Sequence, residues 1–205
     1  NRKGLKFFKP EDTQAHNIYI IAVGTPVNND GEPDLSHVIQ SAEWIGARLQ
    51  RRNTVMLRST VPVGATREIV CPLLENKSGL RAGIDFSLVF TPERTVQGDA
   101  LRELRELPQV VGGLTANCTN RAINFWSTLS PSVVTAESPE AAELIKLSNN
   151  AFRDYSFAFS NELALLADQY NINAFRLIES AYSGYPRDQL PVPSPGVGGY
   201  CLTKD

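Results

Sequence analysis

Residues 17–26 read Asn-Ile-Tyr-Ile-Ile-Ala-Val-Gly-Thr-Pro, a nearly continuous apolar run that ends in a Gly-Thr-Pro turn. Such runs are typical of strands that are buried on both faces of a parallel sheet. Further strand-like segments, each separated from the next by a helical stretch, lie at residues 54–58, 86–90, 109–111 and 132–135. Strand and helix alternate roughly every 25–30 residues, which predicts an α/β fold with a doubly wound, Rossmann-like parallel sheet.

The composition is that of an ordinary globular protein, with 205 residues of which 42% are hydrophobic and 20% are charged. The net charge of -2 indicates no basic surface for nucleic acid or an anionic membrane. No apolar run reaches the roughly 18 residues that a membrane span needs. The cysteines at 71, 118 and 201 are odd in number and lack metal-ligand spacing. We therefore expect no metal site, and reduced thiols in a cytoplasmic protein.

Small, hydroxylic or acidic residues follow the first three predicted strands, at Gly24-Thr25-Pro26, Ser59-Thr60 and Thr91-Pro92-Glu93. Ligands of open parallel sheets bind outside the carboxyl ends of the strands, so these turns are expected to line a cofactor crevice. The alternative is ordinary turn chemistry, which explains the Gly and Pro residues but not all three turns together. No G-x-G-x-x-G occurs, so we expect the phosphate-binding unit of a dinucleotide fold to lie upstream.

The second half of the chain is predicted to be helical from Ser138, a candidate N-cap that is followed by Pro139 at the first helical position. No Gly and no further Pro occurs up to residue 169, and apolar residues recur at helical spacing. One helix of roughly 30 residues, about 45 Å long, is expected as the spine of a helical domain or of a subunit interface. The predicted domains are residues 1–136, the C-terminal part of the Rossmann-like sheet, and 137–205, the start of an all-helical domain.

Three polar residues of the predicted helix are candidates for a site. Lys146 and Asn150 are four residues apart and share a helix face, and Asn161 falls at nearly the same azimuth. A solvated helix face is the alternative interpretation of this pattern. Asparagine is a poor helix former, however, so its use in mid-helix indicates a site rather than a contribution to stability.

The last ten residues, 196–205, bring three glycines, a cysteine, a lysine and an aspartate together. A cation such as Lys204 near Cys201 lowers the pKa of the thiol, and the thiolate is the nucleophilic form. The alternative is a small buried cysteine beside a turn. The chain begins without a methionine and stops just after this loop, so we expect it to be a fragment.

Taken together, these segments resemble the UDP-glucose/GDP-mannose dehydrogenase family of nucleotide-sugar 6-dehydrogenases. The motifs that carry the resemblance, in the order of the family, are residues 23–26, 59–64, 91–94, Lys146 with Asn150, residues 159–162 and residues 196–205. The resemblance implies an NAD-dependent, four-electron oxidation of the C6 alcohol of a nucleotide sugar to the carboxylate, without release of the aldehyde. A covalent anchor suits such a reaction, because a free aldehyde would escape before the second NAD binds.

The resemblance also implies the roles of individual residues. Cys201 would be the nucleophile that carries first a thiohemiacetal and then a thioester. Lys146 and Asn150 would stabilise the oxyanion and position C6. Asp205 would assist proton transfer or hold a water. The residues implied to order the hydrolytic water are Thr60 and Glu93.

The same resemblance implies two binding sets. The residues along the NAD would be Gly24, Thr25, Pro26, Ser59, Thr60, Glu93 and Lys204. The residues at the nucleotide sugar would be Glu93, Arg94, Lys146, Asn150, Arg187 and Gly198. Of these, Arg187 would be the substrate arginine of the family, which reaches the site of a neighbouring subunit.

One segment departs from many UDP-glucose enzymes of the family. Residues 92–98 read Pro-Glu-Arg-Thr-Val-Gln-Gly, where those enzymes have Pro-Glu-Phe-Leu-Arg-Glu-Gly. This form resembles the branch that acts on N-acetylated sugars, UDP-N-acetylmannosamine or UDP-N-acetylglucosamine. UDP-glucose and GDP-mannose are the alternative substrates within the family.

Two further alternatives change the function. A β-hydroxyacid dehydrogenase also joins a Rossmann domain to a long helix with a lysine, but its single hydride transfer needs no cysteine. A non-catalytic dimerisation module would use the long helix alone. A homodimer through that helix is expected under every alternative. The family also has a Gly-rich NAD loop and a C-terminal nucleotide-binding domain, so we expect these 205 residues to be inactive alone.

Overall fold

The computed structural model describes residues 16–96, 98–187 and 189–194, and the account below is confined to them. They form two compact units. The first extends to Glu143, apart from Asn29–Gly31, and the second contains Asn29–Gly31 and the residues from Leu144 onward. Each unit is described by itself. Among the described residues, no helix combines the length and the apolar character needed to cross a membrane.

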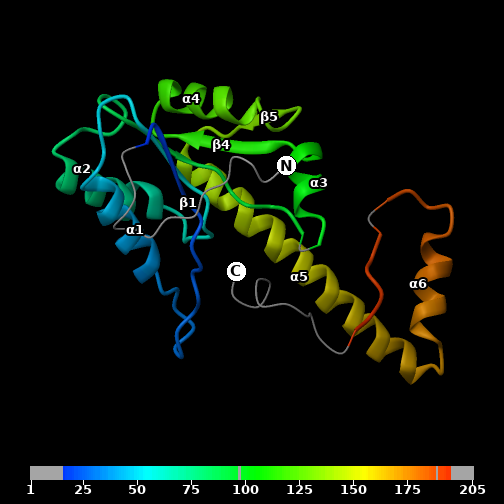
Figure 1. Cartoon of the computed structure of the whole chain (residues 1–205). Coiled ribbons are helices and arrows are strands. Elements are labelled where there is room, and N and C mark those ends of the chain that lie inside the picture. Colours follow the sequence, from blue (N-terminus) through cyan, green and yellow to red (C-terminus); the bar gives the residue numbers. More distant parts are fainter. Residues whose placement is uncertain (1–15, 97, 188, 195–205) are drawn as a thin grey trace. The chain divides into compact units, whose positions relative to one another are not determined.

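The first unit is built on a five-stranded sheet with the order β1-β2-β3-β4-β5 (Figure 1). The strands are β1 (Ile18–Ile21), β2 (Thr54–Leu57), β3 (Ser87–Phe90), β4 (Gln109–Gly113) and β5 (Val133–Thr135). The first three strands are parallel and in register, so that Ile21, Leu57 and Phe90 lie side by side. The Rossmann-like α/β fold class expected from the sequence is confirmed, and all five strands lie where the apolar runs predicted them.

One strand pair differs from the prediction of a fully parallel sheet, because β4 runs antiparallel to β3 while β5 is parallel to β4. A parallel pair needs a crossover element that packs on the sheet. The connection between β3 and β4 contains only α3 (Ala100–Glu106), which has no buried residue. Helix α3 packs Leu104 against the core but buries no residue fully, so it is not a crossover helix of the usual kind, and β4 runs opposite to β3.

The outer strand β1 also differs from its prediction. Tyr19 and Ile21 are buried, but Ile18 and Ile20 are 37% and 41% exposed, so one face of the strand is open in the described structure. Strands β2, β3 and β4 are buried at every residue, as expected for strands covered on both faces. Among the described helices α1 packs on β1, on the face of Tyr19 and Ile21, so the expectation that both faces are covered is wrong for the described residues.

Helices connect the strands close to the predicted positions. They are α1 (Ser36–Gly46), α2 (Cys71–Ser78) and α4 (Ala116–Trp126). A π-helical turn at Thr66–Val70 precedes α2 and was not predicted. Pro72 explains it, because proline has no N–H to donate to the carbonyl four residues earlier, and the wider turn is closed instead by the Cys71 N–H bonding to Thr66 O.

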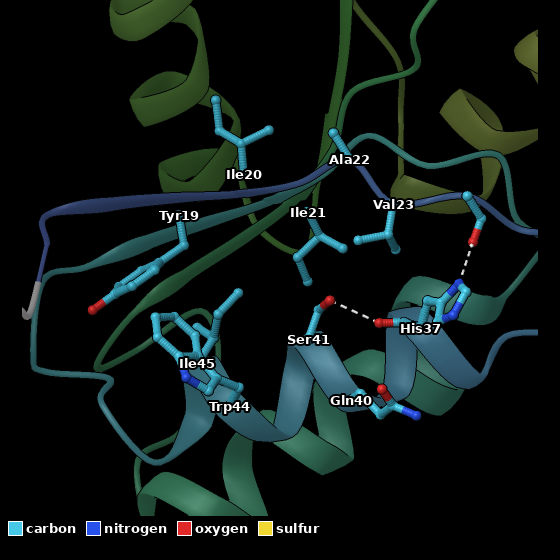
Figure 2. Close-up of a pocket in the computed structure, with 11 residues that line it drawn as sticks. Tyr19, Ile20, Ile21, Ala22, Val23, His37, Gln40, Ser41, Trp44 and Ile45 are labelled. Atoms are coloured by element: carbon cyan, nitrogen blue, oxygen red, sulfur yellow. Dashed lines mark hydrogen bonds between the residues drawn. The ribbon is translucent and has the colours of Figure 1, made fainter. Parts of the chain in front are cut away.

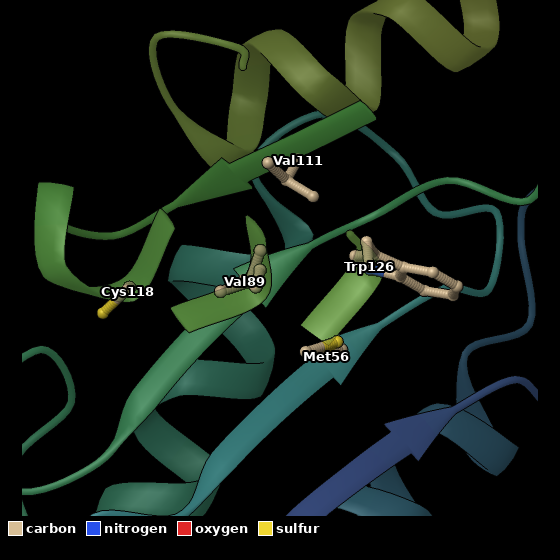
Figure 3. Close-up of a cluster of buried hydrophobic side chains, with 6 residues drawn as sticks. Met56, Val89, Val111, Cys118 and Trp126 are labelled. Atoms are coloured by element: carbon tan, nitrogen blue, oxygen red, sulfur yellow. The ribbon is translucent and has the colours of Figure 1, made fainter. Parts of the chain in front are cut away.

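The core of the first unit lies where α4 packs on the sheet (Figure 3). Met56, Val89 and Val111 come from three neighbouring strands, and Trp126 covers them from α4. The end of β4 has glycines because the chain passes very close: a Cβ at Gly112 would lie 2.2 Å from the Ser138 carbonyl oxygen. The backbone packing around this strand end therefore requires glycine.

The long helix α5 (Pro139–Gln169) was predicted almost to the residue. The Ser138 hydroxyl accepts a hydrogen bond from the Ala141 N–H at 3.2 Å, as expected of an N-cap. Its first turn belongs to the first unit, and the helix continues through the second. In the second unit α6 (Ala174–Tyr182) follows, and Asn173 caps it by accepting from the Arg176 N–H.

Candidate functional site

The carboxyl ends of β1 and β2 are tied together by two hydroxyl groups. The Ser59 hydroxyl accepts from the Val23 N–H at 2.8 Å and donates to the Val23 carbonyl at 2.7 Å. The Thr25 hydroxyl donates to the Thr60 carbonyl at 2.7 Å. The side chains of Ser59 and Thr25, two predicted cofactor residues, therefore hold the two turns against each other and shape the edge at which a ligand of a parallel sheet binds.

The end of β2 is tied to the segment after β3 by an arginine. Arg58 is only 7% exposed, and its Nε and Nη2 lie 2.8 and 2.7 Å from Oε2 of Glu93. The remaining donors face the Thr91 carbonyl and the Gln109 side chain at 3.3–3.4 Å, and the Trp126 ring centroid lies 4.5 Å from the guanidinium carbon. A buried cation needs an anionic partner, and Glu93 supplies it.

Glu93 is held as a carboxylate that remains in contact with solvent. Its side chain is 47% exposed, and its Oε1 accepts from the Thr95 N–H at 2.8 Å. Partial burial by itself would raise the pKa of Glu93, but the Thr95 amide and the Arg58 charge outweigh burial and lower the pKa below its ordinary value. An ionised, oriented carboxylate can accept a hydrogen bond or a proton from a water molecule.

The strand register brings the two predicted water-ordering residues to matching positions. Leu57 and Phe90 are partners in the parallel ladder. Thr60 and Glu93 each follow their strand partner by three residues. Both therefore leave the sheet at the same edge, and Thr60 is half-buried there.

The loop after β2 is fixed by Glu143, a fully buried carboxylate in the first turns of α5. Its two oxygens accept from the Gly64 N–H at 2.6 Å, the Thr66 N–H at 2.9 Å and the Thr66 hydroxyl at 2.5 Å. Burial raises the pKa of Glu143, although these three hydrogen bonds oppose the rise. The start of α5 is thus bonded directly to the loop that follows Thr60.

A groove of about 860 Å³ lies between β1 and α1 (Figure 2). Tyr19 and Ile21 line it from the strand, and Trp44 and Ile45 line it from the helix. Among the predicted cofactor residues that the structure describes, only Gly24 lines this groove. A Cβ at Gly24 would meet no atom within 4 Å among the described residues, so the strand end faces open space.

These strand ends fit a dinucleotide cofactor. The three parallel strands finish at one edge, their turns are small and braced by hydroxyl groups, and the end of β1 faces open space. The predicted cofactor residues that the structure describes all lie on these turns, at Gly24, Thr25, Pro26, Ser59, Thr60 and Glu93.

The second unit contains the predicted helix residues. Lys146 and Asn150 are half-buried on α5, one turn apart. Asn161, also on α5, accepts a hydrogen bond from the Ser194 N–H at 2.9 Å, so it holds the loop that follows α6. Arg187 is exposed, with its guanidinium 5.7 Å from the Tyr185 ring centroid.

Arg94, predicted to bind substrate, is half-buried in the first unit and donates to the Pro108 carbonyl at 2.5 Å. Burial and the nearby Arg58 lower its pKa. Its guanidinium is therefore already engaged by the protein backbone.

The cysteine loop lies outside the described residues, and with it the predicted Gly198, Cys201, Lys204 and Asp205. The other two cysteines are free thiols. Cys118 is buried, and burial together with Glu75 raises the pKa of Cys71 to about 11. A thiol with that pKa is a poor nucleophile at neutral pH.

Sequence reasoning missed Arg58 and Glu143. The signal for Arg58 is a charged residue directly after the apolar residues of β2, at the end of the predicted strand 54–58. The signal for Glu143 was a carboxylate that interrupts an apolar helix stripe one turn before Lys146. A charged residue among core positions needs a buried partner, and that expectation identifies both.

Comparison with known proteins agrees with this architecture. Residues 2–130 match the model of the NAD binding domain of the UDP-glucose/GDP-mannose dehydrogenase family, and residues 140–205 match the model of its central domain. The chain is 37% identical to a UDP-N-acetyl-D-mannosamine dehydrogenase of Pyrococcus horikoshii over 95% of its own length. It is 36% identical to an NDP-N-acetyl-D-galactosaminuronic acid dehydrogenase of Ralstonia solanacearum over 96% of its length.

The similarity to solved structures covers the same part of the chain as the sequence similarity. The solved structure of a UDP-N-acetylmannosamine dehydrogenase from Pyrococcus horikoshii superposes with a TM-score of 0.89 at 36% identity, covering 95% of this chain and 46% of the other. The chain thus spans about half the length of the curated relatives that it matches. The chain belongs to the UDP-glucose/GDP-mannose dehydrogenase family, and its cofactor is NAD.

Proposed function

We propose that the full-length protein oxidises the C6 alcohol of a UDP-N-acetylhexosamine, UDP-N-acetylmannosamine or UDP-N-acetylglucosamine, to the uronic acid. The observation that carries the proposal is the ionised Glu93, which leaves the sheet beside the braced ends of β1 and β2. The relatives named for N-acetylated sugars support the choice of substrate. Residues 92–98 support it as well, since they differ from the form of many UDP-glucose enzymes.

The proposed chemistry is a covalent oxidation on Cys201. The thiolate adds to the C6 aldehyde to give a thiohemiacetal, whose oxidation gives a thioester, and water then releases the uronate. Each NAD, when bound, accepts one hydride, so one alcohol and one water give a carboxylate, about two NADH and about three protons. Cys71 is a poor alternative nucleophile because its pKa is about 11.

Each predicted site residue has a proposed role in this reaction. Lys146 and Asn150 on α5 would hold the oxyanion of the tetrahedral species, as fixed donors do in acyl transfer. Asp205 would assist proton transfer, and Thr60 and Glu93 would order the hydrolytic water. The proposed NAD contacts are those of the strand ends, Gly24, Thr25, Pro26, Ser59, Thr60 and Glu93, with Lys204. The proposed contacts of the sugar nucleotide are Glu93, Arg94, Lys146, Asn150, Arg187 and Gly198.

The proposed partner is a second copy of the chain. Large apolar side chains recur along α5 at helical spacing and are exposed, among them Phe152 at 72%, Tyr155 at 69% and Phe159 at 48%. Such a stripe is typical of a surface that another protein covers. Replacing Phe152 and Tyr155 with Ser should convert a dimer into a monomer in light scattering, and an unchanged mass would contradict the proposed interface.

The free thiols support a proposal for the cell compartment. Cys71 and Cys118 are free, which is usual for proteins of a reducing compartment. We therefore propose a cytoplasmic enzyme.

The decisive experiment measures NADH formed per sugar consumed by the full-length protein. UDP-N-acetylmannosamine, UDP-N-acetylglucosamine and UDP-glucose are offered in turn. About two NADH per sugar are expected with an N-acetylated sugar, and Cys201→Ser should abolish the full turnover. About one NADH would remove the thioester from the mechanism, and preference for UDP-glucose would overturn the choice of substrate.

A further inference from the structure

We infer that Arg58 is a positioning residue for the hydrolytic step: it occupies Oε2 of Glu93 and leaves Oε1 as the oxygen that receives a proton from the attacking water. This inference rests on the proposed role of Glu93 in ordering that water. Arg58 itself is buried under Trp126, so it acts through Glu93 and not on the substrate.

The two carboxylate oxygens differ in what they can still accept. Each oxygen of an ionised carboxylate has about two acceptor positions. The Nε–H of Arg58 donates to Oε2 at 2.8 Å, and Nη2 lies 2.7 Å from the same oxygen, so the guanidinium covers Oε2. Oε1 accepts from the Thr95 N–H at 2.8 Å, and the Thr95 hydroxyl also bonds the carboxylate, but no charged group covers Oε1 among the described residues. Because the side chain is half exposed, a water can reach the carboxylate from the side that Arg58 does not cover.

Several partners hold the Arg58 guanidinium in place. Its guanidinium donates to Glu93, to the Thr91 carbonyl and to Gln109, so every one of its nitrogens is engaged. The Trp126 ring packs against its face at 4.5 Å. The guanidinium on Oε2 and the Thr95 N–H on Oε1 together orient the carboxylate, and a lysine ammonium would lack the rigid planar donors of arginine.

The other charged groups near this pair are already bonded elsewhere. Arg94, on the same segment as Glu93, donates to the Pro108 carbonyl. Glu103 of α3 accepts from the Val96 N–H at 2.6 Å. The positive charge that Glu93 contacts directly is therefore that of Arg58.

The step that this arrangement serves is balanced without a further reactant. The water oxygen bonds to the thioester carbonyl carbon, and the carbon–sulfur bond breaks. The sulfur of Cys201 leaves as the thiolate with the bonding electron pair. One water proton passes to Oε1 of Glu93 and then to solvent, and the other is lost when the acid ionises. A carboxylate fixed in one plane directs this transfer along a single lone pair.

The test compares Arg58→Gln and Arg58→Lys in the full-length enzyme, with Arg67→Gln as the matched control. Arg67 also grips a glutamate, Glu140 at 2.6 Å, but lies outside the proposed site. For Arg58→Gln we expect a kcat about 10- to 100-fold lower, with the first NADH of each turnover formed at a nearly normal rate. The acid limb of its kcat–pH profile should move to higher pH, because Glu93 loses the charge that lowers its pKa.

The conservative variant and the control complete the design. Arg58→Lys keeps the charge but not the planar grip, so it should return the acid limb to the wild-type pH while kcat stays lowered. Arg67→Gln should leave the rate and the profile unchanged. A folded Arg58→Gln enzyme with the wild-type kcat and profile would overturn the inference.

A second measurement does not depend on turnover. The carboxyl carbon of Glu93 is titrated by NMR in 13C-glutamate-labelled wild-type and Arg58→Lys proteins, and is assigned by its loss in Glu93→Gln. The inference requires a pKa below the ordinary value of about 4.3 in both proteins, and a higher pKa overturns it, even if Arg58→Gln does not fold. If no nucleotide sugar yields NADH, the proposed function fails while this titration still tests the grip of Arg58 on Glu93.

Discussion

Replacing Glu143 with Gln tests whether the start of α5 is held to the loop after β2 by a buried carboxylate. Glutamine has the same shape but only one acceptor oxygen. If the amide oxygen of the new glutamine accepts from the N–H and the hydroxyl of Thr66, its NH2 group faces the buried Gly64 N–H. Two donors then face each other, and neither has an acceptor. These hydrogen bonds join residues almost eighty positions apart in the sequence, so no local contact can replace them.

The expected loss can be built from these contacts. A buried N–H without an acceptor costs about 1–3 kcal/mol, and two bonds that lose their charged acceptor weaken by about 0.5–1 kcal/mol each. Relief from burying the Glu143 charge, which is what raises its pKa, offsets part of this sum. We therefore expect Glu143→Gln to lower the free energy of unfolding by about 2 kcal/mol.

The assay is urea unfolding of wild type, Glu143→Gln and Glu140→Gln, at pH 7 and with a common m-value. Glu140 is the matched control because it lies one turn earlier on α5 and is partly exposed. Its loss should cost less than about 1 kcal/mol. Equal midpoints for the two variants would refute the reasoning, since the buried clasp would then be worth no more than a surface ion pair.

Three further outcomes are expected. The Arg67 hydrogen bonds lower the pKa of Glu140 to about 2. Arg67→Gln should therefore lower the free energy of unfolding at pH 7, by less than about 1 kcal/mol, and this loss should fade as the pH falls from about 4.5 to 2. A loss that stays constant over this range in acid unfolding curves contradicts the expectation. Gly112→Ala should destabilise by about 3 kcal/mol or more, because its Cβ would lie 2.2 Å from a backbone oxygen, and a melting temperature within a degree of wild type would be incompatible with that contact. Alkylation at pH 8 should label Cys201 far faster than Cys71, whose pKa of about 11 leaves roughly 0.1% thiolate, and peptide mass spectrometry that finds Cys71 labelled first would contradict this order.

The parts of the fold that the sequence predicted well are those set by local chemistry. Helix α5 was located almost to the residue because Ser138 and Pro139 begin it and no glycine interrupts it. The apolar runs located every strand for the same kind of reason, since alternation and length are properties of a short segment.

The parts that were predicted wrongly depend on neighbours. The exposure of Ile18 and Ile20 depends on which helices pack on each face of β1, which a run of apolar residues does not reveal. The reversed direction of β4 goes with α3, a short helix that buries no residue fully and provides no crossover helix.

In the candidate site too, the residues that follow a local sequence pattern were predicted, and the contacts between distant residues were not. The turn residues after β1, β2 and β3 could be selected from the sequence because turn chemistry at successive strand ends is a local pattern. The clasp of Arg58 on Glu93 joins residues 35 positions apart, and the pKa of Glu93 depends on that contact. Neither could be derived before the strands were placed side by side.

The hydroxyl group of Ser59 links the backbones of two turns, since it bonds both the N–H and the carbonyl of Val23. Those turns therefore become rigid together when the protein folds. Fixing the backbone of one residue costs about 1–2 kcal/mol of conformational entropy, and here that cost falls on folding. A molecule that docks on this edge meets a surface that is already ordered, so more of its contact energy remains as affinity.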